Sequence, residues 1–133
     1  MLAIAYNPIG IVESPIIEPL RPEVIRAVKS RLALHPCFAQ AVAGLEVGQH
    51  LLVIYHIHHV RPWQDDLMPE LFTRRIAGRP NPIGVTLTRI VALNDSTITV
   101  VGLDAINGSP ILDIKPYQPI FDAPPVQPQV REA

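Results

Sequence analysis

The chain reads Arg79-Pro80-Asn81-Pro82-Ile83-Gly84-Val85 in its second half and Leu112-Asp113-Ile114-Lys115-Pro116-Tyr117 further along. In both segments prolines, which lack a backbone N–H donor and restrict φ, stand directly beside side chains that bind ligands. The first segment offers a guanidinium and an amide, and the second offers a carboxylate, an ammonium and a phenol. Such a composition is unusual in a plain strand, so we expect residues 79–84 to form an irregular loop that binds a ligand.

Short apolar, β-branched runs surround these two segments and predict strands. We expect strands at residues 2–12, 49–60, 71–73, 85–93, 97–103 and 111–114. Turn residues separate the last three of them, at Asn94-Asp95-Ser96 and at Asn107-Gly108. In the run 49–60, the period of two places Ile54, His56 and His58 on one face and Tyr55, Ile57 and His59 on the other.

One helix is expected near the N-terminus. Pro22 and Glu23 are favourable residues for a first helical turn, and Val24, Ile25, Val28 and Leu32 follow at helical spacing. Pro36 ends this helix, and residues 38–43 form a second short helical turn that Gly44 closes.

These elements predict a mainly β fold, namely a small, mostly antiparallel β-barrel with one α-helix and a short helical turn. A closed barrel removes the exposed edges that many short strands otherwise create. No Gly-x-Gly-x-x-Gly segment follows a strand and opens a helix, so the pattern of a doubly wound nucleotide-binding fold is missing from the sequence.

Composition and charge limit the kind of protein. The 133 residues suit one domain, and 48% hydrophobic against 17% charged residues argues against disorder. No apolar run approaches the roughly 18 residues of a membrane span, and the N-terminus lacks a secretion signal, so we expect a cytoplasmic protein without a membrane partner. The single Cys37 is expected to be a buried thiol. The net charge is −1, yet residues 71–94 contain four arginines and no acidic residue.

Together the segments resemble the TsaA-like, or TrmO, family of S-adenosylmethionine-dependent methyltransferases, which typically reads T-R-x-x-x-R-P-N-P-I-G and then G-T-P-x-L-D-I-K-P-Y. The matching residues are Thr73-Arg74, Arg79 to Gly84 and Gly108 to Tyr117, and residues 8–15 are similar to the opening I-G-x-x-x-S-P. The resemblance covers roughly residues 8–122. One departure lies at Arg75-Ile76-Ala77-Gly78, where the family usually has Ser-Pro-His or a similar triplet.

The resemblance implies a TsaA-like β-barrel domain at residues 1–122, followed by a proline-rich C-terminal tail at 123–133. It also implies a homodimer, S-adenosylmethionine as cofactor, and methylation of N6 of threonylcarbamoyl-adenosine next to the tRNA anticodon. The altered linker 75–78 and the weak overall basicity permit another acceptor, such as a small molecule.

Candidate site residues follow from the resemblance and from side-chain chemistry. The candidates for cofactor binding are Arg79, Pro80, Asn81, Ile83, Gly84, Asp104 and Lys115. Arginine binds carboxylates and phosphates bidentately, and glycine permits close backbone approach. The candidates for substrate binding are Arg74, Arg75 and His58. The candidates for catalysis are Asp113, which could hold the N–H of the acceptor amine, and Tyr117, which could stack on a base. Alternatively, Asp113 and Lys115 pair only with each other.

Two further functions stay open. Imidazoles two residues apart, at His56 and His58, can reach one metal ion with help from His50, His59, Asp65, Asp66 or Glu70, as in metal-dependent barrel enzymes. No second histidine or glutamate motif with suitable spacing follows, so we expect no metal. The other possibility is a barrel that binds the ligand without catalysing a reaction.

Overall fold

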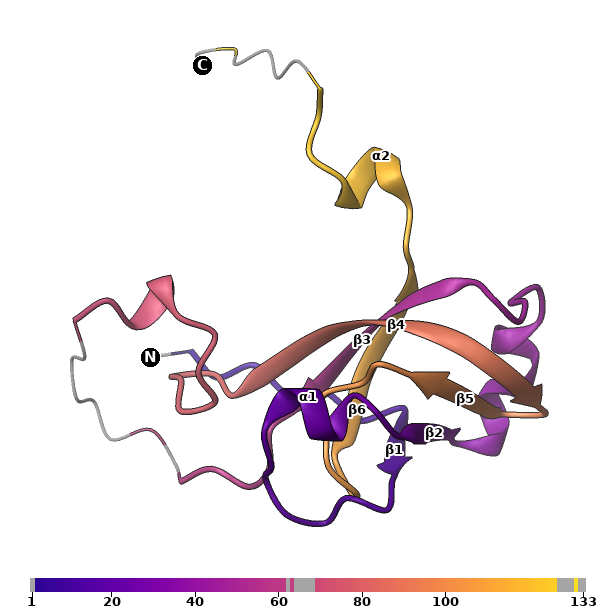
Figure 1. Cartoon of the computed structure of the whole chain (residues 1–133), viewed down its shortest axis with the longest axis horizontal. Coiled ribbons are helices and arrows are strands. Elements are labelled where there is room, and N and C mark those ends of the chain that lie inside the picture. Colours follow the sequence, from indigo (N-terminus) through magenta and orange to yellow (C-terminus); the bar gives the residue numbers. More distant parts are fainter. Residues whose placement is uncertain (1, 62, 64–68, 127–130, 132–133) are drawn as a thin grey trace.

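Six antiparallel strands form a closed barrel in the order β1-β2-β5-β4-β3-β6 (Figure 1). In this computed structural model residues 2–61, 63, 69–126 and 131 are described. The strands are β1 (Gly10–Glu13), β2 (Lys29–Leu34), β3 (His50–His56), β4 (Ile83–Asn94), β5 (Thr97–Val101) and β6 (Pro110–Pro116). The predicted mainly β barrel is therefore confirmed.

Helical segments are short. They are the α-helices α1 (Pro22–Ile25) and α2 (Pro119–Asp122) and the 3-10 helices η1 (Pro36–Val42) and η2 (Leu71–Thr73). Figure 1 shows that α2 and the N-terminal segment both extend away from the barrel, in different directions. None of the helices in the described part of the chain has the length and hydropathy needed to cross a membrane.

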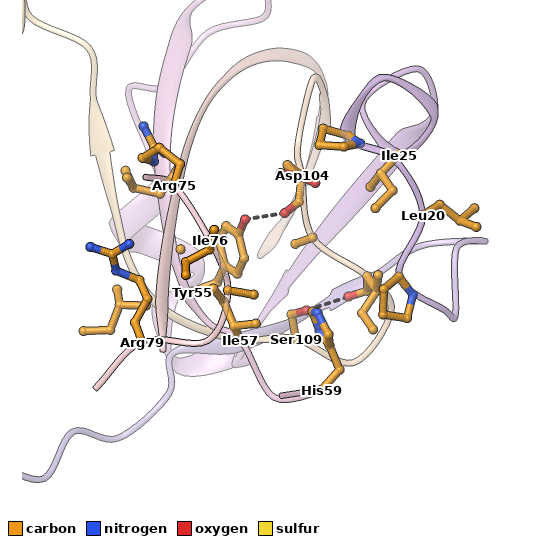
Figure 2. Close-up of a pocket in the computed structure, with 18 residues that line it drawn as sticks. Leu20, Ile25, Tyr55, Ile57, His59, Arg75, Ile76, Arg79, Asp104 and Ser109 are labelled. Carbon is orange, nitrogen blue, oxygen red and sulfur yellow. Dashed lines mark hydrogen bonds between the residues drawn. The ribbon is translucent and has the colours of Figure 1, made fainter. Parts of the chain in front are cut away.

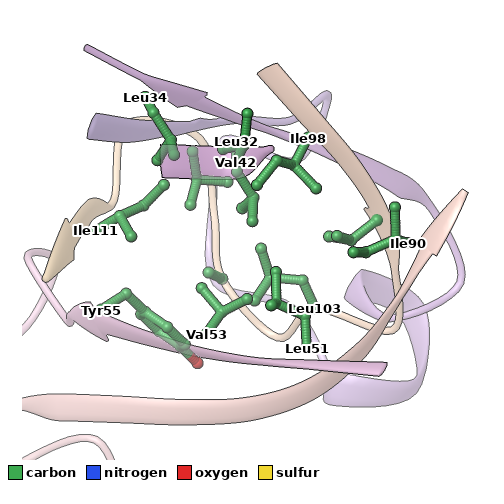
Figure 3. Packing of buried hydrophobic residues seen from close by; sticks show 13 residues of the cluster. Leu32, Leu34, Val42, Leu51, Val53, Tyr55, Ile90, Ile98, Leu103 and Ile111 are labelled. Carbon is green, nitrogen blue, oxygen red and sulfur yellow. The ribbon is translucent and has the colours of Figure 1, made fainter. Parts of the chain in front are cut away.

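The interior of the barrel holds alternate residues of every strand. Figure 3 shows how their apolar side chains converge on one core. Val12, Leu32, Val53, Ile98, Val100 and Ile111 are fully buried within it. Burial of such side chains stabilises a fold by about 1.5–3 kcal/mol each, so the period-two pattern of the strands determines which face of each strand turns inward.

The predicted long helix from Pro22 is wrong beyond Ile25. Residues 29–34 instead form β2, which pairs with β1 on one side and with β5 on the other. Ser30, Leu32 and Leu34 point into the barrel, whereas Lys29 and Arg31 are exposed. Hydrogen bonding to two neighbouring strands has overridden the helical spacing, as tertiary context often does.

Other predictions also differ from the observed structure. Strand β1 begins only at Gly10, β3 ends at His56 rather than near residue 60, and residues 71–73 form a 3-10 helix rather than a strand. Strand β4 begins at Ile83, so the last two residues of the predicted irregular loop 79–84 belong to a strand. At Gly10 an added Cβ would lie less than 3.0 Å from backbone atoms of Ala33 and Leu34, so only glycine permits the observed approach of β1 to β2.

A β-bulge in β6 decides which face its polar side chains occupy. Tyr55 pairs with Ile111 whereas Ile54 pairs with Asp113, so Leu112 is an extra residue on β6. Ile111 and Ile114 consequently pack against the core, and Asp113 and Lys115 face outward.

The predictions for Cys37 and for the C-terminal tail have different outcomes. Cys37 is exposed rather than buried because it lies in the first turn of η1, on the surface of the barrel. The proline-rich tail lies partly outside the described residues, and the division of the chain at residue 122 stays a prediction.

Candidate functional site

A cavity of about 610 Å³ lies beside the end of the barrel where β3 ends and β4 begins. One wall contains Tyr55 within β3, Ile57 just after β3, the start of β4, and Arg75, Ile76, Ala77 and Arg79. The opposite wall is formed by residues 19–25, which include α1, and by residues 104–109 between β5 and β6. Segments far apart in the sequence therefore meet at one site.

The side chain of Tyr55 extends from the first wall to Asp104 in the opposite wall (Figure 2). Its ring covers Gly84, its direct cross-strand partner, where an added Cβ would lie less than 3.0 Å from three ring and hydroxyl atoms. Its hydroxyl donates a hydrogen bond to the backbone carbonyl of Asp104, and the hydroxyl oxygen lies 3.4 Å from Oγ1 of Thr86. Burial raises the pKa of Tyr55 above its usual value of 10.0, and the nearby Asp104 carboxylate adds to this effect.

Asp104 presents its carboxylate to the cavity. Its neighbours Leu103 and Ala105 are buried in the core, whereas Asp104 itself is partly exposed. Within the described ranges, no arginine, lysine or histidine forms an ion pair with this carboxylate. It can therefore accept a hydrogen bond from a positively charged ligand group.

Arg75 and Arg79 contribute positive charge on the other wall. Arg75 donates a hydrogen bond to the backbone carbonyl of Val85 over 2.9 Å, and Arg79 donates one to the carbonyl of Arg74 over 2.7 Å. The guanidinium of Arg79 also lies 5.6 Å from the ring centroid of Phe72. Each guanidinium has five N–H donors, so these contacts orient both groups and leave donors for a ligand.

The two signs of charge are separated across the cavity. Figure 2 shows Arg75 and Arg79 on one side, Asp104 on the other and Tyr55 between them. Leu20, Ile25, Ile57 and Ile76 add apolar surface. The arrangement suits a ligand that carries an anionic group, a cationic group and an apolar ring.

Five of the predicted site residues line this cavity: Arg75, Arg79, Ile83, Gly84 and Asp104. Pro80, Asn81 and Arg74 do not line it. The carbonyl of Asn81 accepts a hydrogen bond from the N–H of Ile83 over 2.8 Å, and the guanidinium of Arg74 lies 3.7 Å from the carboxylate of Glu70.

Asp113, Lys115 and Tyr117 also lie outside the cavity lining. The ammonium of Lys115 lies 3.0 Å from the carboxylate of Asp113 on the outer face of β6, so the two residues do pair with each other. Tyr117 follows β6 and donates its backbone N–H to the carbonyl of His50 over 3.1 Å.

Of the two histidines that follow β3, only His59 lines the cavity. His58 lies beside Gly108. His58 is mostly exposed, but the part of its ring that is shielded from water, followed by the neighbouring His59 and His56, lowers its pKa. The described residues contain no group of three or more His, Cys, Asp or Glu side chains that could hold a metal ion. Asp65 and Asp66, named above as possible ligands, lie outside those residues.

Sequence reasoning missed Tyr55, Ile57 and His59, which line the cavity together. Their period-two spacing had placed them on one face of the run 49–60, opposite Ile54, His56 and His58. This division of the run into two faces could have identified Tyr55, Ile57 and His59 as a group. The missed residues Leu20, Ile25 and Ser109 carry no comparable signal, because they enter the cavity from separate segments.

Comparison with known proteins places the chain among related sequences. The family described as tRNA-methyltransferase O N-terminal domain matches residues 13–123. A protein of Pyrococcus abyssi named a probable S-adenosyl-L-methionine-binding protein is 33% identical over 132 residues, which cover 91% of this chain and 72% of that protein. The Escherichia coli protein named tRNA (adenine(37)-N6)-methyltransferase is 32% identical over 146 residues.

Solved structures agree in fold. A crystal structure of TrmO matches with a TM-score of 0.78 and 29% identity, covering 96% of this chain and 64% of the other. TrmO from Pseudomonas aeruginosa matches with a TM-score of 0.76 and 30% identity. The chain spans 62% of the length of the Escherichia coli relative and of the Pseudomonas protein, so these proteins have further residues that this chain does not match.

Proposed function

This chain belongs to the family of the tRNA-methyltransferase O N-terminal domain, and from that membership we infer that it is an S-adenosylmethionine-dependent methyltransferase. We propose that the acceptor is N6 of an adenosine in tRNA, specifically threonylcarbamoyl-adenosine next to the anticodon. The observation that carries the proposal is the cavity with arginines on one wall and a carboxylate on the other.

The residues present fit the cofactor. A cavity of about 610 Å³ lies within the roughly 300–1,000 Å³ typical of small-molecule sites. S-adenosylmethionine carries a carboxylate, an ammonium, a sulfonium and an adenine. Arg79 and Arg75 can bind the carboxylate, Asp104 can accept from the ammonium, and Leu20 and Ile25 can contact the adenine.

When bound, this cofactor supplies a methyl group on a sulfonium, which departs as a neutral thioether. The protein therefore needs to supply alignment and electrostatics rather than covalent chemistry. Arg75 and Arg79 orient the carboxylate of the amino-acid end, Asp104 orients the ammonium on the same α-carbon, and the apolar lining excludes water from the rest of the cavity. Ile57 and Ile76 belong to that lining.

The acceptor proposal is supported by the name of the Escherichia coli relative and by the arginines of residues 71–94. Arg74 and Arg89 are exposed outside the cavity lining and can face phosphates. The linker 75–78 contributes Ile76 and Ala77 to the cavity. This linker is the segment where a different acceptor would be selected, because it differs from the usual family sequence and lies at the site.

The proposed homodimer bears on the predicted catalytic residues. Asp113, Lys115 and Tyr117 lie outside the cavity of their own barrel, so their predicted roles require a second copy to bring them to its cavity. Exposed apolar residues on the outer face of β4, Ile83, Val85 and Leu87, are the surface that a second copy would cover. The molar mass in solution, measured by light scattering, tests this. The cytoplasmic location stays a prediction.

Calorimetric titration with S-adenosylmethionine tests the proposed cofactor. We expect saturable binding by the wild-type chain, and loss of that binding in Arg79→Ala. Arg89→Ala is the matched control, because Arg89 lies on β4 but does not line the cavity. Equal affinity of Arg79→Ala and of the wild type for S-adenosylmethionine would show that Arg79 does not bind the cofactor.

Transfer of a labelled methyl group tests the acceptor. Threonylcarbamoylated tRNA should accept the label, and the same tRNA without the threonylcarbamoyl group should not. Binding of the cofactor without transfer to any tRNA would contradict the proposed acceptor and indicate either a small-molecule acceptor or a binding protein without catalysis.

A further inference from the structure

We propose that Tyr55 is a positioning residue that holds the carboxylate of Asp104 in the orientation that accepts the cationic end of the bound ligand. The inference rests on the proposed function, since it concerns the same cavity. Neither the family match nor the names of the relatives assign a role to Tyr55 or to its hydroxyl.

The backbone on both sides of Asp104 is fixed. Leu103 and Ala105 are buried, with exposed fractions of 0% and 4%. Asp104, between these two buried neighbours, is partly exposed and lines the cavity. What remains to be fixed is the peptide plane that follows Asp104.

The hydroxyl of Tyr55 fixes that plane, because it donates to the Asp104 carbonyl. The bond crosses the site: Tyr55 belongs to β3, and Asp104 lies 49 residues later in the connection between β5 and β6 (Figure 2). This hydrogen bond is partly buried, so it restrains both partners because a polar group left without a partner away from water is costly.

Gly84 makes the position of the ring possible. Its missing side chain leaves the space that the Tyr55 ring occupies. Gly84 therefore contributes to the site indirectly: it leaves room for the Tyr55 ring, and the Tyr55 hydroxyl in turn bonds to Asp104.

The Asp104 carboxylate is available to bind a positively charged ligand group. Across the described chain no cationic side chain pairs with Asp104. A ligand ammonium would be its first strong partner, and hydrogen bonds to charged groups depend on alignment. Loss of the Tyr55 hydroxyl should therefore weaken the binding of ligands whose amino-acid end carries an ammonium. It should not affect ligands that lack this end.

The experiment compares two ligands in four proteins. S-adenosylmethionine has an amino-acid end that carries the ammonium and a carboxylate, and 5′-methylthioadenosine lacks this end. The proteins are the wild type, Tyr55→Phe, Asp104→Asn and the double variant, with Tyr6→Phe as a control for the same chemical change at an exposed residue outside the cavity. Affinities are measured by calorimetry, and the melting temperature of each ligand-free protein is recorded.

We expect Tyr55→Phe to weaken binding of S-adenosylmethionine about fivefold and that of methylthioadenosine less than about twofold. Asp104→Asn should weaken only S-adenosylmethionine, by about tenfold or more. In the Asp104→Asn background, Tyr55→Phe should change the affinity for S-adenosylmethionine little, because the group that it positions is no longer charged.

Equal losses for both ligands, or additive losses in the double variant, would show that Tyr55 acts only through general stability and would overturn the inference while leaving the proposed function intact. Absence of S-adenosylmethionine binding by the wild type would instead refute the proposed function. Should Tyr55→Phe not fold, Gly84→Ala, whose added Cβ displaces the Tyr55 ring, takes its place in the same comparison: a loss selective for S-adenosylmethionine supports the inference, and equal losses for both ligands overturn it.

Discussion

The ring of Tyr55 occupies the space where Gly84 of β4 has no side chain, so this glycine affects the cavity through its cross-strand partner on β3. The sequence predicts that Gly84 lets the backbone approach a ligand closely. Its observed neighbour is an aromatic ring, which connects β3 and β4 to the carbonyl of Asp104.

Replacing Gly84 by alanine should displace that ring. Overpacking of this kind lowers the free energy of unfolding by about 1–3 kcal/mol, and the displaced hydroxyl should lose its bond to Asp104. Urea unfolding measures the loss. Gly78→Ala is the matched control, because an added Cβ at Gly78 has no atom within 4 Å. Equal effects of the two substitutions would contradict the assigned role of Gly84.

Alkaline pH should destabilise the protein through Tyr55. The pKa of its hydroxyl is higher in the folded than in the unfolded state, so above the usual value of 10.0 the unfolded chain loses this proton first. The stability contribution is complete below about pH 10 and is lost as pH rises toward the folded-state pKa.

Unfolding experiments between about pH 8 and pH 11 check this by comparing the wild type with Tyr55→Phe. The free energy of unfolding should fall more steeply with pH in the wild type. Tyr6 and Tyr117 are present in both proteins and cancel in the comparison. Parallel curves would show that Tyr55 ionises equally in both states.

Ser30 should tolerate loss of its hydroxyl. Its Oγ is buried, and no hydrogen-bond partner is found for it among the described residues. Ser30→Ala should therefore keep or raise the free energy of unfolding, by up to about 1 kcal/mol. Ser109→Ala makes the same change where the hydroxyl donates to the carbonyl of Ile106 over 2.7 Å, and should lower it by about 1–2 kcal/mol. A loss at Ser30 as large as that at Ser109 would indicate a partner for its hydroxyl.

Asp113→Asn should separate catalysis from stability. The pair with Lys115 is solvent-exposed, with side chains 48% and 62% accessible, so its removal should cost less than about 1 kcal/mol of stability. If Asp113 acts on the acceptor amine in a neighbouring copy, the methyl-transfer rate should fall about 100-fold with unchanged cofactor affinity. Glu13→Gln, in the exposed pair with Arg31, is the control. An unchanged transfer rate would exclude the catalytic role.

Local sequence was sufficient to predict a structural element where only one pattern, such as a pair of turn residues, was present. The turns at Asn94 to Ser96 and Asn107-Gly108 appear as predicted, with Asp95 and Gly108 at positive φ. It was insufficient for residues 29–34, because Leu32 fits both the helical spacing from Val28 and the strand alternation with Ser30 and Leu34. Pairing with β1 and β5 decided between the two.

The sequence by itself determined most of the short strands and their alternation of inward and outward side chains, and also the irregular backbone of residues 79–82 within the predicted loop 79–84. These properties follow from short-range rules of proline geometry, alternation and side-chain chemistry. Tertiary structure alone decided that Tyr55 meets Asp104 across 49 residues, and that the bulge at Leu112 turns Asp113 outward. The physical reason is that strand register and barrel closure depend on contacts between distant segments, and no local period encodes them.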